Sequence, residues 1–257
     1  MGRDSEVETT KEHGAKAPEQ KGTAVKINPC RTYNNPLTRL SKAIATFALS
    51  TAVLASVAYA QSAYPPAKLL AARWWQWAME TPASQSPLTD QTGQFASANQ
   101  PHGPVWFLAG NEGGTTTRTV TIPAGKALFF PVANVFDVED GTAVGGGGKV
   151  FSVKNPLQTA QAFVASLIAT AGGMSCTVDG TPIAITSDNL EQSTPFTLNL
   201  DADNLLGIPA GVYYPAVDSG YYVLVPPLPA GQHTIHFAGT IAAFSFSLDV
   251  TYNITVQ

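Results

Sequence analysis

Cysteine and charge are both scarce in this chain, and each shortage excludes a way of stabilising a fold. Cys30 and Cys176 are the only cysteines among 257 residues. Cys30 precedes an apolar segment typical of a signal peptide, so a processed chain would keep one cysteine and could form no internal disulfide. Charged residues make up 12% of the chain. We therefore expect a hydrophobic core to stabilise the fold, with Cys176 as a small buried residue in it.

The motifs of common enzymes are also missing. The sequence contains no GxSxG, HExxH or CxxC motif, which removes the usual evidence for a serine hydrolase, a zinc protease or a thiol oxidoreductase. Residues 145–148 are four glycines, but no predicted helix follows them, so they indicate a connection and not a phosphate-binding loop. These absences argue against catalysis and leave the question of enzyme activity open.

An uncharged apolar segment at residues 43–60 follows two basic residues and ends in the small-x-small sequence AYA. This pattern predicts a signal peptide over residues 39–60, cleavage near Ala60, and a secreted or periplasmic protein. The alternative is a signal anchor, because the segment reaches the roughly 17 to 25 residues that a membrane-spanning helix needs. Frequent alanine and serine, and the prolines at 65 and 66, favour cleavage.

The cleavage site divides the chain into parts of different composition. Residues 1–38 are polar and are expected to be disordered, or to be an over-long N-terminal extension, whereas residues 61–257 are expected to form a single domain. Beyond residue 60 there are six Lys and Arg against thirteen Asp and Glu, a net charge of −7. Such a balance repels nucleic acid and anionic membrane surfaces, so neither is an expected partner of the processed protein.

Strand patterns dominate the expected domain. At the C-terminus, seven apolar side chains alternate with polar ones, which predicts a strand with one buried face: Phe244, Phe246, Leu248, Val250, Tyr252, Ile254 and Val256. Asp179-Gly180 predicts a hairpin turn, and Asp218-Ser219-Gly220 predicts another between VYYPAV and YYVLV. Helices are predicted over 66–80 and 157–171, the second ended by Gly172-Gly173. We expect an all-β, antiparallel sandwich of jelly-roll or immunoglobulin-like type with two packed helices.

Five segments carry a resemblance to known proteins: WWQWAMETPASQSPLTD, GPVWFLAG, TRTVTIPAGKALFFPV, SCTVDGTP and PPLPAGQHTIHF. Together they resemble a group of secreted bacterial proteins that are uncharacterised, over most of residues 66–257. The resemblance implies export from a bacterium and brings no activity. Members of that group often carry further cysteines around Gln94–Ser97 and near Val120, which this chain lacks, so no disulfide framework is carried over.

Histidines and aromatic residues are the candidates for ligand contact. His102, in the loop NQPHGP, is the histidine best placed to meet a ligand. His233 and His236 fall on opposite faces of a predicted strand and cannot chelate one metal. Exposed aromatic rings would suit a carbohydrate, and the candidates are Trp75, Tyr213, Tyr221 and Tyr222, although filling of the core is the other interpretation of such residues.

Two acidic loops offer oxygen ligands for calcium, one with Asp137, Glu139 and Asp140 and the other with Asp201 and Asp203. Neither follows the EF-hand pattern, so calcium is the only cofactor indicated and solvated loops are the alternative.

Two functions remain open. The first is a secreted, non-catalytic binding or surface protein that recognises an extracellular glycan or a protein surface. The second is an extracellular polysaccharide hydrolase or lyase that uses Asp137, Glu139 or Asp201 with His102. Oligomeric state is not indicated.

Overall fold

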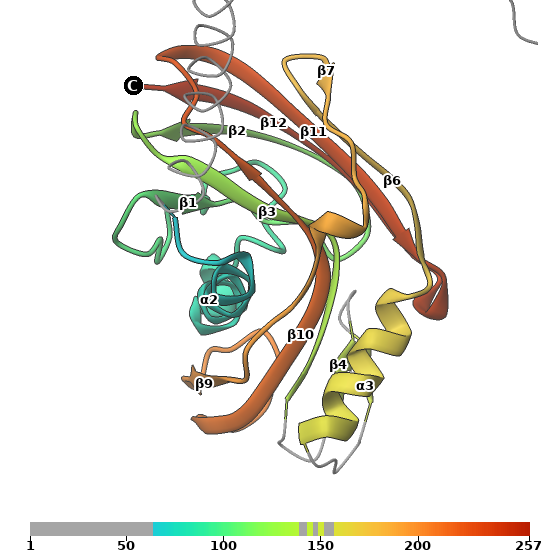
Figure 1. Ribbon diagram of the computed structural model, residues 1–257. Coiled ribbons are helices and arrows are strands. Elements are labelled where there is room, and N and C mark those ends of the chain that lie inside the picture. Colours follow the sequence, from blue (N-terminus) through green and yellow to red (C-terminus); the bar gives the residue numbers. More distant parts are fainter. Residues whose placement is uncertain (1–63, 139–142, 146–148, 152–156) are drawn as a thin grey trace, which may run out of the picture. The chain divides into compact units, whose positions relative to one another are not determined.

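A computed structural model describes residues 64–138, 143–145, 149–151 and 157–257. The predicted signal peptide, the segment before it, and Glu139 and Asp140 lie outside the described residues. The described part is an all-β sandwich with two helices, as expected, and its two five-stranded sheets do not close into a barrel (Figure 1). None of the helices in the described ranges is long and apolar enough to cross a membrane.

The first sheet has the order β1-β3-β10-β8, with β9 also paired to β10. Its strands are β1 (Val105–Phe107), β3 (Ala127–Val138), β8 (Leu190–Gln192), β9 (Phe196–Leu200) and β10 (Gly211–Val225). The second sheet has the order β2-β12-β11-β6-β7. Its strands are β2 (Gly114–Ile122), β6 (Ala171–Val178), β7 (Thr181–Pro182), β11 (Gly231–Ile241) and β12 (Phe246–Val256).

Strand direction is mixed, because β1 runs parallel to β3 and β2 runs parallel to β12. All other pairs are antiparallel. The expectation of antiparallel strands is thus met in most of both sheets and fails at one edge of each. Alternation in a single strand shows which face is buried, but it carries no information on the direction of the neighbouring strand.

Small elements complete the described chain. A two-stranded ribbon is formed by β4 (Ala143–Gly145) and β5 (Lys149–Phe151). Three 3₁₀ helices are η1 (Ala83–Gln85), η2 (Ser187–Asn189) and η3 (Ala242–Phe244).

A hydrophobic core fills the space between the sheets. The predicted alternation of the C-terminal strand is present, because Leu248, Val250, Tyr252, Ile254 and Val256 of β12 are all buried. Phe130 of the first sheet stacks on Phe237 of the second, with ring centroids 4.8 Å apart. Burying one large apolar side chain of this kind contributes about 1.5–3 kcal/mol, so this layer is a major part of the stability.

Helix α2 (Ala67–Glu80) covers the opposite face of the first sheet (Figure 1). The helix carries three tryptophans, Trp74, Trp75 and Trp77, and all three rings are buried. The indole N–H groups of Trp74 and Trp77 donate to the carbonyl oxygens of Leu108 and Ala98, both at 2.9 Å. The tryptophans therefore belong to the core and do not form an exposed aromatic patch.

Helix α3 (Leu157–Ile168) packs on the extended ends of β3 and β10 and buries Ala160, Val164 and Ile168 against them. It is shorter than expected. Ala171 already belongs to β6, and Gly172-Gly173 lies inside that strand and does not end the helix.

The expected turn at Asp218-Ser219-Gly220 is wrong, because β10 runs unbroken from Gly211 to Val225. All three residues are buried. Gly220 is required by packing, since a Cβ atom at this position would lie 2.5 Å from the Cβ atom of Asn134 on β3. The glycine here permits the close approach of two strands and does not permit a turn.

Candidate functional site

An open groove of about 550 Å³ lies between one face of α2 and the loop that precedes β1. It is lined by Arg73, Gln76, Trp77, Glu80, Asn99, Gln100, Pro101 and His102. The four helix residues follow the i, i+3, i+4, i+7 spacing that places side chains on one face of a helix. Helical spacing in the sequence could identify this polar face, whereas only the fold shows that the loop lies opposite it.

Hydrogen bonds to β9 hold the helix side of the groove. The Gln76 side-chain amide donates to the carbonyl oxygen of Thr197 at 2.9 Å. Glu80 accepts at Oε1 from both the backbone N–H and the side-chain amide of Asn199, at 2.9 and 3.2 Å. These side chains are therefore used in building the wall.

The loop side is held equally well. Gln100 Nε2 donates to the carbonyl oxygens of Ala96 and Phe107, at 2.9 and 2.8 Å, and its Oε1 accepts from the Phe107 N–H at 3.0 Å. The bond from Trp77 to Ala98 joins this loop to α2. Hydrogen bonds within the protein thus hold both walls of the groove in place.

Three groove residues have side chains that make no hydrogen bond or ion pair to any part of the chain that the structure describes: Arg73, Asn99 and His102. All three are exposed. Asn99 lies in a turn and has a positive φ of 49°. Beside them, the Lys126 ammonium donates to the carbonyl oxygen of Gly103.

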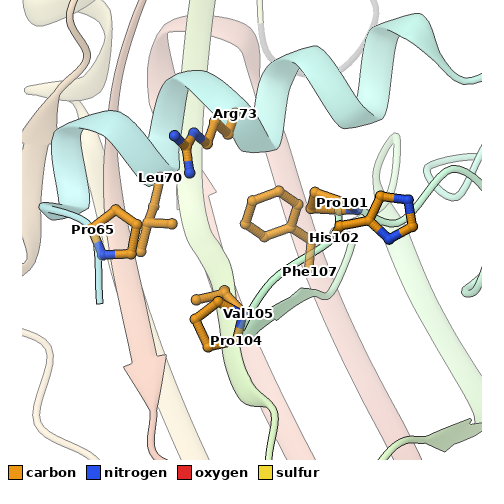
Figure 2. Close-up of a pocket in the computed structure, with 8 residues that line it drawn as sticks. All are labelled: Pro65, Leu70, Arg73, Pro101, His102, Pro104, Val105 and Phe107. Atoms are coloured by element: carbon orange, nitrogen blue, oxygen red, sulfur yellow. The ribbon is translucent and has the colours of Figure 1, made fainter. Parts of the chain in front are cut away.

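A second, smaller pocket of about 30 Å³ adjoins the groove and shares Arg73, Pro101 and His102 with it (Figure 2). Its other lining residues are Pro65, Leu70, Pro104, Val105 and Phe107. Apolar side chains therefore form its floor, and the two basic side chains stand at its edge. Its volume matches that of about one water molecule or one small chemical group.

Of the candidate aromatic residues, Trp75 and Tyr222 are buried, at 4% and 3% exposure. Neither ring is on the surface, which corrects the expectation that they present a platform for a sugar. Tyr213 is half-buried against the core beneath α2, and its hydroxyl donates to the Pro209 carbonyl oxygen at 2.6 Å. Tyr221 is half-buried against the cluster around α3.

Trp75 and Tyr222 instead meet at a buried carboxyl group that the sequence did not single out, that of Asp218. The Trp75 indole N–H and the Tyr222 hydroxyl donate to Asp218 Oδ1 at 2.6 and 2.9 Å. Asn134 Nδ2 donates to the Tyr222 hydroxyl at 3.1 Å. Asp218 Oδ2 is buried without a hydrogen-bond partner among the described residues. Burial raises the pKa of Asp218 to about 8, although the bonds from Trp75 and Tyr222 oppose the shift.

The acidic candidates are not brought together. Asp137 is buried at the end of β3, whereas Asp201 and Asp203 are exposed in the loop after β9. Asp203 accepts a hydrogen bond from the Ser84 hydroxyl at 2.6 Å. Within the described ranges, no three His, Cys, Asp or Glu side chains lie close enough to hold a metal ion. Calcium binding stays a prediction.

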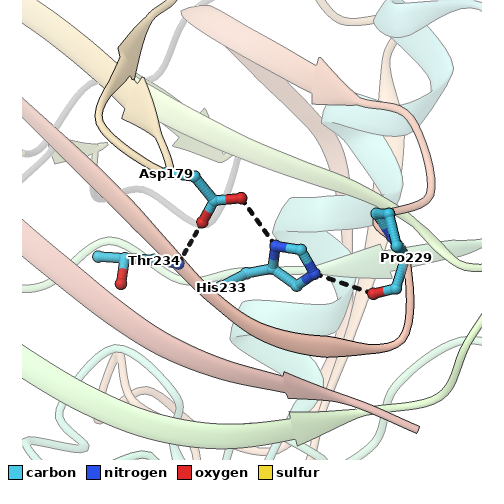
Figure 3. A network of polar contacts seen from close by, with 4 residues as sticks. All are labelled: Asp179, Pro229, His233 and Thr234. Carbon is cyan, nitrogen blue, oxygen red and sulfur yellow. Dashed lines mark hydrogen bonds and ion pairs between the residues drawn. The ribbon is translucent and has the colours of Figure 1, made fainter.

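The two strand histidines contact different carboxylates, as their opposite faces require. His233 lies between two acceptors, with Nδ1 2.8 Å from Asp179 Oδ2 and Nε2 2.9 Å from the Pro229 carbonyl oxygen (Figure 3). The hydrogen bond to Asp179 raises the pKa of His233. His236 Nε2 lies 3.1 Å from Asp249 Oδ1. Both histidines lie outside the lining of the groove.

No family model and no curated protein matches the sequence. Among solved structures, the chain is similar to PbICP-C in its complex with falcipain-2, at 11% identity and a TM-score of 0.22, over 60% of this chain and 100% of that one. It is also similar to Amebosin in its solution structure, at 14% identity and a TM-score of 0.16, over 56% of this chain and 96% of that one. Likeness at this level carries no argument about function.

Proposed function

We propose that the protein is a non-catalytic binding protein that holds an extracellular glycan in the groove along α2. The observation that carries this proposal is that the groove contains two kinds of polar side chain, some bonded within the protein and some not. Gln76, Glu80 and Gln100 in its walls are hydrogen-bonded within the protein, whereas the side chains of Arg73, Asn99 and His102 are exposed and make no hydrogen bond or ion pair with the described residues.

Pre-formed walls favour binding because they leave little conformational entropy to lose when a ligand arrives. Gln76 and Glu80 are already tied to β9, and Gln100 is tied to β1. A few convergent polar groups on a rigid wall are the usual arrangement of a small-molecule or oligosaccharide site. Only the side chains of Arg73, Asn99 and His102 would lose conformational freedom when a ligand binds.

A sugar chain suits this groove because it offers hydroxyl groups as donors and acceptors along its length. The groove is open and mainly polar, so a polymer could enter it and continue past its ends. Pro101 and the edge of Trp77 add the limited apolar contact that the C–H face of a sugar can use. The three unbonded side chains can donate to sugar oxygens, and Asn99 can also accept.

The carboxylates favour binding over hydrolysis. Glycosidases use two carboxyl groups roughly 5 to 10 Å apart. Among the residues that line the groove, Glu80 is the only carboxylate, and its Oε1 already accepts from Asn199. Asp137 and Asp201, which were candidates for a catalytic pair with His102, are not among the lining residues.

The test is a binding survey of the full chain against neutral and acidic polysaccharides, with the supernatant analysed for released sugars. A triple variant, Arg73→Gln, Asn99→Gly and His102→Gln, removes the unbonded groups and breaks none of the hydrogen bonds that build the walls. Glycine is chosen at 99 because it tolerates the positive φ. We expect retention of a glycan by the natural chain and its loss in the triple variant.

The matched control is Lys68→Gln, an exposed change on the same helix outside the groove. It should bind as the natural chain does. Release of sugars, or retention that the triple variant leaves unchanged, would refute the proposal.

A further inference from the structure

Basic side chains gather around one loop of an otherwise acidic protein. The structure describes four Lys and Arg side chains, Lys68, Arg73, Arg118 and Lys126, of which Arg118 is buried. Two of the other three border the loop 101–104: Arg73 lines the same pockets as His102, and Lys126 donates to Gly103. His102 lies in the loop itself. Although the net charge beyond residue 60 is −7, the exposed basic side chains that the structure describes are thus concentrated at this loop.

The surroundings of Arg73 and His102 strengthen their effect on a ligand. In Figure 2 the ring of Phe107 lies between Leu70 and Arg73 on one side and His102 on the other. Phe107 and Leu70 are both buried, at 1% and 2% exposure, so the floor beneath the two basic groups is apolar. An ionic hydrogen bond formed against an apolar floor is stronger than one formed in open water.

We infer that the groove selects a glycan that carries an acid group, a carboxylate or a sulfate, and that this group binds at Arg73 and His102. This inference rests on the proposed glycan-binding function. The acid group lies where the groove meets the small pocket, and the sugar carbons beside it contact Pro101.

Donor chemistry argues for an acid over a neutral sugar. The guanidinium of Arg73 has five N–H donors and no acceptor, and none of these donors is used within the described chain. Two parallel bonds to one acid group satisfy its fork geometry, whereas a single hydroxyl does not. The acidic remainder of the protein repels anions in general, so retention of an acidic glycan requires this local contact.

The position of Glu80 orients the ligand. It is seven residues from Arg73 on the same helix face, which is about 10 Å along the axis. One carboxylate oxygen of Glu80 is bound to Asn199, and the residue lines the far end of the groove. The acid group of the ligand therefore lies at the Arg73 end, and hydroxyl groups face Glu80. A glycan with sparse acid groups fits better than one that is charged at every sugar.

Two matched pairs of probes test the inference by calorimetry on the full chain. The first pair is a xylo-oligosaccharide with one glucuronic acid branch and the unbranched oligosaccharide of the same length. The second pair is a monosulfated and an unsulfated galacto-oligosaccharide. We expect the acidic member of at least one pair to bind about tenfold more tightly than its neutral partner, as one charge-assisted hydrogen bond would give. The pair that shows this preference distinguishes carboxylate from sulfate.

Variants then locate the acid group. Arg73→Gln and His102→Gln should each reduce the preference, and Arg73→Lys should keep part of it, because lysine retains the charge without the fork. Lys68→Gln removes the same charge from the same helix outside the groove and should change nothing. Unchanged melting temperatures would show that each variant is folded, since the side chains of Arg73 and His102 make no hydrogen bond or ion pair within the described residues.

Each outcome supports or overturns the acid-group site. A preference that Arg73→Gln abolishes and Lys68→Gln preserves supports the inference. Equal binding of acidic and neutral members, binding of neutral glycans alone, or an equal effect of Lys68→Gln overturns the acid site and leaves glycan binding standing. Absence of binding to every glycan tested overturns the proposed function, and the acid site with it.

Discussion

Replacing Asp218 by asparagine should stabilise the protein at neutral pH. The carboxyl group is completely buried, and burial raises its pKa from 3.8 to about 8. In the unfolded chain the group ionises above pH 3.8, whereas in the folded chain it keeps its proton until about pH 8. Folding at pH 7 must therefore take up a proton, and this uptake is unfavourable at that pH.

The size of the effect follows from the shift. One pKa unit corresponds to about 1.4 kcal/mol, so the penalty on folding is on the order of 4 kcal/mol at pH 7. Because the folded pKa is raised, the free energy of unfolding is highest below about pH 4, falls as the pH rises, and levels off above about pH 8.

Asparagine is the suitable replacement because it keeps the contacts and cannot ionise. Its Oδ1 can still accept from Trp75 and Tyr222, the two donors that bind Asp218 Oδ1. Its amide would replace the protonated Oδ2, which has no partner among the described residues. The asparagine amide has two N–H donors where the protonated carboxyl group has one O–H, so Asp218→Asn buries one further donor without a partner. This cost is about 1–3 kcal/mol, does not depend on pH, and is smaller than the ionisation penalty at pH 7.

The measurement is urea unfolding of the natural chain and of Asp218→Asn between about pH 4 and pH 8, followed by tryptophan fluorescence. The free energy of unfolding of Asp218→Asn relative to that of the natural chain should rise by on the order of 4 kcal/mol between about pH 4 and pH 7. Burial also raises the pKa of the neighbouring Glu191, so Glu191→Gln is measured alongside. A constant difference between the natural chain and Asp218→Asn across this pH range would refute the reasoning.

Three further predictions rest on single contacts. The imidazole of His233 should titrate above 6.5 by NMR, and Asp179→Asn should lower its pKa, because the bond to Asp179 is the main cause of the shift. The stabilisation from this pair is complete below pH 6.5 as long as Asp179 stays ionised, and it is lost as the pH rises through the raised value; a His233 pKa at or below 6.5 would contradict it. Gly220→Ala should reduce the free energy of unfolding by about 1–3 kcal/mol, because the new Cβ meets Asn134, and urea unfolding would detect this. Cys176, whose burial raises its pKa to about 11, should resist a thiol reagent until the chain unfolds, and rapid labelling of the native protein would show that it is accessible.

Two similar sequences show where local prediction succeeds and where it fails. Asp179-Gly180 was expected to be a hairpin turn, and it is one, with φ values of 51° and 76° between β6 and β7. Asp218-Ser219-Gly220 carries the same kind of signal, yet it lies in the middle of β10. These residues of β10 pair instead with β3 and β8, and Trp75, 143 positions away, donates to Asp218. No local pattern around Asp218 contains that contact.

Some features of the groove could also be predicted from the sequence, and others could not. A polar stripe of Arg73, Gln76 and Glu80 follows from helical spacing alone, and the loop position of His102 marked it as a candidate for ligand contact. The use of Gln76 and Glu80 as wall supports depends on β9, which follows more than a hundred residues later. The sequence could thus predict which polar residues share a face, and could not predict which of them stay unbonded.

The tryptophans of α2 connect the core to the groove. Their rings are largely apolar, but each also carries one N–H that must find an acceptor when it is buried. The acceptors are the Leu108 carbonyl, the Asp218 carboxyl group and the Ala98 carbonyl, which come from three separate parts of the chain. Three bonds in different directions fix both the rotation and the position of the helix. Since Ala98 directly precedes Asn99 in the loop, the bond from Trp77 also sets the width of the groove. A change in the tryptophan cluster should therefore alter the proposed glycan binding even though two of the three rings do not line the groove.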